Sequence, residues 1–190
     1  GLASHEYFHT WNIKRLRPVE LGPFNYEDEV HTRSLWMAEG LTDYYGELAL
    51  HRAGLSSREE LLDALSNHIE GLQTTPGRMV QSVEEASFDA WIKYYRPDEN
   101  SPNVSISYYT KGAVLGLLLD ARIRAATEGA GSLDDVMRAA FDKFSGDRGF
   151  TPDEFRAVVE QVSGLSLASF WEGAVEGTAE LEYGETLETF

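Results

Sequence analysis

Two histidines and a glutamate close to the start of the chain follow the pattern His5-Glu6-x-x-His9. Residues i and i+4 of a helix differ by about 40° around the axis and lie ~6 Å apart along it, so both imidazoles can face one ion. Glu6 lies next to the first histidine and can reach a water molecule bound to that ion. The pattern therefore predicts a zinc site with His5 and His9 as ligands and Glu6 as a catalytic general base.

A catalytic zinc ion usually has three protein ligands and one open position, so a third ligand is expected elsewhere in the chain. Glu39 is a carboxylate near the start of an apolar helical segment, which makes it the candidate. Asp43 lies one helical turn later and shares its face. We expect Asp43 to accept a hydrogen bond from a ligand imidazole and so to orient it. A solvated helix carboxylate is the alternative for Asp43.

The segment between these motifs is polar and basic in an otherwise acidic chain. It contains Trp11, Asn12, Lys14, Arg15 and Arg17. Such a patch is suited to contacting a ligand or carboxylates. Ordinary surface ion pairs are the simpler explanation for any one of these side chains.

Most of the chain has helical spacing of apolar residues, and few segments alternate strictly. The sequence therefore predicts a mainly α fold with at most a small sheet. Helices are expected at residues 3–11, 34–53, 56–72, 83–94 and 107–127, then at 132–144, from 151 onwards and at 166–176, with a loop at 96–103. Ser56 with Glu59 is read as a capping box, and Ser132, Thr151 and Ser166 are expected to open later helices.

The amino-acid composition limits the classes of partner and metal ligand that are expected for the chain. The chain has 32 Asp and Glu against 16 Lys and Arg, a formal net charge of −16. Such a surface repels phosphate backbones, so nucleic acid is not expected as a partner. No apolar run is long enough to cross a bilayer. The chain has no cysteine, so any metal must be held by histidine and carboxylate.

Two segments resemble a known family. Residues 4–12 with 14–18 closely resemble the zinc-binding motif of the glycyl aminopeptidase family of gluzincin metallopeptidases, and residues 35–45 resemble its second motif, which supplies the glutamate ligand. The resemblance spans residues 3–183. It implies the helical part of a thermolysin-like catalytic domain, with Glu39 as the third zinc ligand.

A third segment, residues 107–113, is similar to the Tyr-x-Lys-Gly-Ala element of the related aminopeptidase N family. In that family the tyrosine hydroxyl stabilises the oxyanion. By this match Tyr109, and not Tyr108, is the candidate for that catalytic role. The alternative for Tyr109 is a core aromatic at the start of a helix.

The resemblance also implies a domain organisation. In the family a β-rich N-terminal domain precedes the catalytic domain, and a PDZ-like module follows it. We expect residues 1–190 to be a catalytic subdomain of a longer protein, truncated on its N-terminal side, with both flanking domains absent. The upstream Gly-Gly-x-Glu motif, which helps to bind the substrate amino terminus in the family, is absent too. Weak or no activity is therefore expected from the isolated chain.

The predicted function is zinc-dependent hydrolysis of a peptide substrate, by attack of zinc-bound water with Glu6 as base. The resemblance implies an aminopeptidase that removes small N-terminal residues such as Gly. Two alternatives stay open. One is an endopeptidase with the same zinc site, and the other is an inactive helical scaffold that binds peptides or partners.

Overall fold

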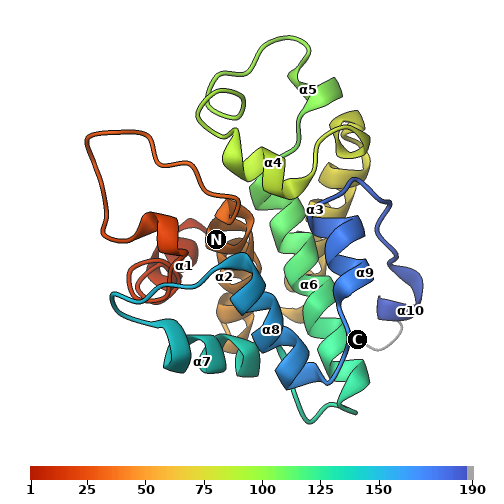
Figure 1. Cartoon of the computed structure of the whole chain (residues 1–190). Coiled ribbons are helices and arrows are strands. Elements are labelled where there is room, and N and C mark those ends of the chain that lie inside the picture. Colours follow the sequence, from red (N-terminus) through yellow and green to blue (C-terminus); the bar gives the residue numbers. More distant parts are fainter. Residues whose placement is uncertain (188–190) are drawn as a thin grey trace.

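The computed structural model describes residues 1–187, and these are mainly helical (Figure 1). They contain two isolated β-bridges and no strand, which confirms the predicted mainly α fold. The α-helices are α1 Leu2–Phe8, α2 Leu41–Arg52, α3 Arg58–Gln73, α4 Val83–Phe88, α5 Ser101–Val104, α6 Tyr108–Ala126, α7 Leu133–Phe144, α8 Pro152–Ser163, α9 Ala168–Phe170 and α10 Gly184–Leu187. Short 3₁₀ turns cover Val19–Leu21 and Pro76–Met79, and π-helical turns cover Trp36–Gly40 and Trp171–Val175.

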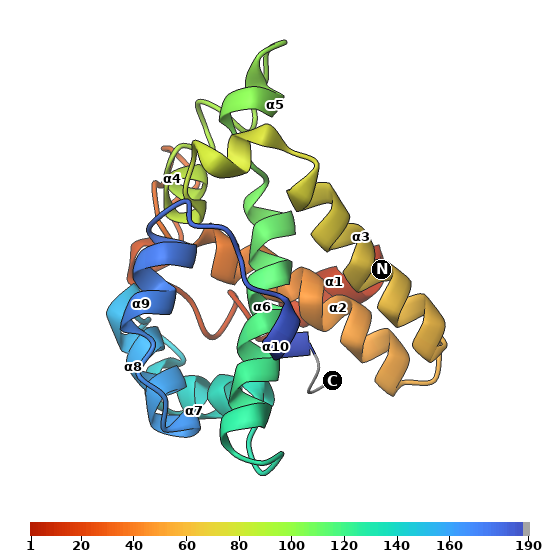
Figure 2. The same cartoon turned by 90° about the vertical axis from the view of Figure 1, so that its right-hand side faces the viewer.

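Helix α6 runs through the centre of the molecule (Figures 1 and 2). Its sequence is the most apolar of the helices, and residues around its whole circumference are buried, as expected of a helix enclosed by others. Figure 2 shows α2 and α3 on one side of it and α8 and α9 on the other. The core of the molecule therefore surrounds this one helix.

A buried carboxylate ties three of these helices together. Asp120 on α6 is 2% exposed. It accepts hydrogen bonds from the Tyr44 hydroxyl of α2 at 2.8 Å, the Leu133 N–H at 2.7 Å and the Arg124 guanidinium at 3.1 Å. Because its oxygens are fully engaged, the charge can remain in the interior.

Two glycines allow the π-turn Trp36–Gly40 to lie directly against α6. A Cβ added to Gly40 would lie 2.4 Å from Gly112 Cα, and one added to Gly112 would lie 2.5 Å from the Trp36 carbonyl oxygen. Side chains are excluded at both positions by this close approach of the backbones. The contact fixes the turn that carries Glu39 against the helix that begins at Tyr108.

The helix starts follow their capping residues, with one correction. Ser57 and Glu60, not Ser56 and Glu59, form the capping box of α3. The sequence repeats the pattern one residue apart, and only backbone geometry decides between the two serines. Ser132 and Thr151 begin α7 and α8 as predicted.

Several boundaries differ from the sequence-based expectation. Helix α1 ends at Phe8, α4 ends at Phe88, and the expected loop at 96–103 leads into the short α5. The helix expected from residue 166 begins only at Ala168. Leu167 is buried and donates its N–H to Glu160 at 2.8 Å, which holds the chain outside the helix at that point.

Among residues 1–187, no helix combines the length and the apolar character that a membrane span requires.

Candidate metal centre

The first two helices bring the histidines to the glutamate. Helix α1 packs against α2, and the Gly46 carbonyl of α2 accepts a hydrogen bond from Ser4 Oγ at 2.8 Å. His9 follows the last residue of α1 but keeps helical backbone angles and donates its N–H to the His5 carbonyl at 3.3 Å. The early end of α1 therefore leaves the two imidazoles one turn apart.

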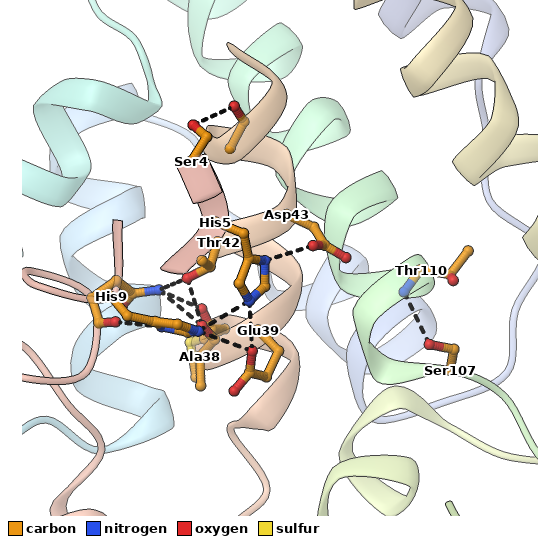
Figure 3. Close-up of polar contacts among 12 residues, drawn as sticks. Ser4, His5, His9, Ala38, Glu39, Thr42, Asp43, Ser107 and Thr110 are labelled. Atoms are coloured by element: carbon orange, nitrogen blue, oxygen red, sulfur yellow. Dashed lines mark hydrogen bonds and ion pairs between the residues drawn. The ribbon is translucent and has the colours of Figure 1, made fainter. Parts of the chain in front are cut away.

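The three expected ligands converge on one point (Figure 3). The Nε2 atoms of His5 and His9 are 3.0 Å apart, and each is 3.2 Å from Glu39 Oε2. The side chains are 12%, 18% and 23% exposed for His5, His9 and Glu39, so solvent reaches the cluster from one side. This is the arrangement of two neutral donors and a carboxylate that zinc prefers.

The hydrogen bonds of the Nδ1 atoms, which point away from the cluster, show which nitrogen of each ring carries the lone pair. His5 Nδ1 donates to Asp43 Oδ1 at 2.7 Å, and His9 Nδ1 donates to the Asn12 carbonyl at 3.0 Å. Each neutral imidazole therefore has its proton on Nδ1 and a bare lone pair on Nε2. Asp43 thus makes the hydrogen bond expected from the sequence.

With both Nδ1 atoms engaged in hydrogen bonds, the two Nε2 atoms and Glu39 Oε2 face one another at 3.0–3.2 Å. Tetrahedral zinc with bonds of ~2.0–2.1 Å places neighbouring donors about 3.3 Å apart. The residues therefore fit a zinc ion in both distance and chemistry.

Burial and neighbouring groups act in opposite directions on His9. Burial lowers its pKa, but the Glu39 carboxylate and the Asn12 carbonyl favour the protonated ring, and the pKa is raised overall. A proton is thus the natural competitor of a metal ion at this position.

Glu6 lies on the open side of the cluster. It lines a cavity of about 380 Å³ together with Gly1, Leu2, His5, Asp43, Gly46, Glu47 and Tyr109. Its side chain is exposed and makes no hydrogen bond or ion pair with the residues that the structure describes. An unengaged carboxylate beside the ligands is available for proton transfer.

Of the two adjacent tyrosines, Tyr109 is the one that lines this cavity. Its ring lies 6.2 Å from the ring of His5, while Tyr108 is 1% exposed in the core. Burial, with the Glu39 carboxylate nearby, raises the pKa of Tyr109 well above its usual value. Its hydroxyl therefore keeps its proton at neutral pH and can donate a hydrogen bond.

The polar and basic segment does not face the cavity. Lys14 and Arg17 lie over the ring of Phe24, and Arg17 also pairs with Asp147 at 3.9 Å. Asn12 is 3% exposed and faces inward. Among these cations only Arg17 makes an ion pair within the described residues, and its side chain is buried, so surface ion pairs do not account for the patch. Asn12 belongs to the interior.

Sequence reasoning missed the tyrosines that surround Tyr109. The ring centres of Tyr94 and Tyr109 are 5.8 Å apart. The hydroxyl of Tyr95 accepts a hydrogen bond from the hydroxyl of Tyr108 at 3.3 Å. The only signal was a pair of adjacent aromatics before an irregular segment. Aromatic pairs are common in cores, so that signal does not indicate a site.

Comparisons with known proteins identify the fold and the family of the chain. The crystal structure of the aminopeptidase N family protein from Idiomarina loihiensis is similar, with a TM-score of 0.93 and 34% sequence identity. The match covers 98% of this chain and 32% of that chain, so the present chain spans about a third of its length. The fold is therefore that of the helical part of a catalytic domain. No curated protein sequence matches the chain.

The sequence model of the M61 glycyl aminopeptidase family matches residues 1–115, which include α1, the π-turn, α2 and the start of α6. All the residues of the cluster lie within that match. The chain belongs to the M61 glycyl aminopeptidase family.

Proposed function

We propose that this chain is the helical, metal-binding part of a zinc-dependent peptidase that removes small residues such as Gly from the amino end of peptides. One observation carries the metal assignment. Two histidine lone pairs and a carboxylate oxygen converge at 3.0–3.2 Å with both outer ring nitrogens already bonded. Family membership supports the peptidase reaction.

In this proposal His5, His9 and Glu39 hold the ion, and Asp43 and the Asn12 carbonyl orient the two rings. When bound, zinc would polarise the scissile carbonyl and lower the pKa of water in the site. Glu6 takes a proton from the attacking water and later passes it to the leaving amine, because it is the carboxylate that lies free beside the ligands. The Tyr109 hydroxyl donates to the oxygen on which negative charge develops.

The charge of the cavity agrees with a substrate that has a free amino group. Glu6, Asp43 and Glu47 all line it, and each contributes a carboxylate. We propose that a β-rich N-terminal domain provides the other wall of the cleft and that a PDZ-like module follows. This is consistent with the chain spanning 32% of the solved relative. On this view the isolated chain turns over substrate weakly or not at all.

Zinc analysis of the full-length protein tests the metal centre. Glu39→Gln should lose bound zinc, whereas Glu6→Gln should retain it and lose ~10²–10⁴-fold in kcat. Glu70→Gln removes an exposed glutamate of α3 and is the charge-matched control. Full zinc content in Glu39→Gln would disprove the ligand set.

Peptides with free and acetylated amino ends test the specificity. An aminopeptidase cleaves only the free forms. Equal rates on both would instead indicate an endopeptidase with the same site. Zinc binding without turnover of any peptide by the full-length protein would indicate the scaffold alternative.

A further inference from the structure

The side chain of Asn12 is buried against the turn that carries Glu39. Its Nδ2 donates to the carbonyl oxygens of Met37 at 2.9 Å and Ala38 at 3.2 Å, and lies 3.0 Å from Thr42 Oγ1. The Thr42 hydroxyl donates to the Ala38 carbonyl at 2.7 Å, so its lone pair is free to accept from Asn12. Both amide hydrogens are thus used within one small network.

The π-turn explains why the Met37 carbonyl needs an outside donor. In an α-helix the N–H of Leu41 would bond to the carbonyl of Met37, four residues earlier. Here that N–H bonds to the Trp36 carbonyl, five residues earlier. The Met37 oxygen therefore loses its helical partner, and a buried carbonyl without a donor is costly. Asn12 supplies the missing hydrogen bond.

The main chain of Asn12 contacts His9, the second histidine of the His5-Glu6-x-x-His9 motif. The Asn12 carbonyl accepts the Nδ1 proton of His9 at 3.0 Å. The next residue, Ile13, has φ of 113°, which a β-branched residue rarely adopts. An isolated bridge between Asn12 and Leu16 holds this turn, with the Ile13 N–H donating to the Leu16 carbonyl at 2.8 Å. Backbone strain of this kind persists only where the surroundings enforce it, and it concentrates at functional sites.

We propose that Asn12 is a positioning residue of the metal centre. Its amide holds open the π-turn that aims Glu39, and its carbonyl fixes the ring of His9, so one residue sets the distance between two ligands. It contacts neither ion nor substrate. The inference rests on the proposed function, because the position of Glu39 matters only if Glu39 is a ligand.

The test is the zinc dissociation constant of the full-length protein, measured by competition with a chelator. Asn12→Asp keeps the shape of the side chain and removes both N–H donors, and it should weaken zinc binding ~10–100-fold, as loss of groups that orient ligands does. Thr42→Val removes the hydroxyl and should have a smaller effect, weakening zinc binding ~2–10-fold. Thr42→Ser keeps the hydroxyl and should bind zinc within ~2-fold of the wild type.

A buried control separates positioning from general stability. Val159→Ala shortens a fully buried side chain of α8, away from the cluster, and should lower Tm without changing zinc affinity. Wild-type zinc affinity in folded Asn12→Asp would overturn the inference, as would an equal loss in Val159→Ala. If Asn12→Asp does not fold, Thr42→Val against Thr42→Ser decides, and equal affinities there overturn it. Full zinc content in Glu39→Gln would instead refute the proposed function, and this inference with it.

Discussion

Alanine at Gly40 or Gly112 should disable the metal centre without altering any ligand. The added Cβ of Gly40→Ala would lie 2.4 Å from Gly112 Cα. Carbon atoms normally approach to about 3.5–4.0 Å, so the π-turn and α6 must separate by ~1 Å or more. The turn is held on its other side by Asn12, and Glu39 lies 3.2 Å from His9 Nε2.

The geometry of the site sets the size of the effect. Metal–ligand distances tolerate deviations of only about 0.2 Å, so a displacement of ~1 Å takes Glu39 out of coordination range. A shift of that size is expected to lower kcat/KM of the full-length protein ~100-fold. The overpacking should also destabilise the fold by ~1–3 kcal/mol.

Zinc affinity by chelator competition and Tm are the assays, with Gly71→Ala as the matched control. A Cβ on Gly71 would meet only Thr110 Cγ2 at 3.7 Å, an ordinary contact on an exposed position of α3. That variant should keep its zinc and gain up to ~1 kcal/mol from helix propensity. Wild-type zinc affinity in Gly40→Ala would refute the claim that the glycine contact positions Glu39.

Three further outcomes are expected. Asp43→Ala leaves the Nδ1 proton of His5 without its acceptor and should weaken zinc binding ~10–100-fold in the chelator assay; unchanged affinity would count against its orienting role. Tyr109→Phe should lower kcat ~10²–10³-fold in the full-length enzyme while zinc content stays the same, and an unaffected kcat would exclude it as the oxyanion donor. The third concerns pH. Hydrogen bonds from Arg148 and the Thr151 N–H lower the pKa of Glu154 below 4.5. A depressed pKa stabilises the fold above pH 4.5, and this contribution is lost as pH falls through the folded-state pKa. Urea unfolding of Glu154→Gln should therefore show a stability deficit at pH ~7 that shrinks as the pH falls through the folded-state pKa of Glu154, and a deficit of constant size over the whole acid range would contradict it.

The histidine motif and the helical fold could be predicted because both depend on local spacing. His5 and His9 need only one helical turn, which their i, i+4 separation supplies. Asp43 follows from the same rule applied to Glu39. Glu39 itself needed the expectation of a third ligand and a family resemblance, since no local pattern separates it from other glutamates.

The remaining features could not be predicted because they depend on contacts distant in sequence. The π-turn requires Asn12 to satisfy Met37 and requires Gly112 to admit Gly40, and neither pairing is visible from one segment. The place of Asn12 in the interior was missed for the same reason. Ser56 and Ser57 show that local patterns can also be ambiguous. Each serine has a glutamate three residues later, and the backbone conformation makes Ser57 the N-cap.

The packing of the π-turn against α6 also bears on when the centre can form during synthesis. Gly112 follows Gly40 by about 70 residues, which at ~5–20 residues per second takes the ribosome several seconds to translate. Both ligand motifs thus emerge well before the helix that locates them. The nascent chain first presents the two histidines and the glutamate as unassembled segments, and the centre can form only when the segment around Gly112 has been translated.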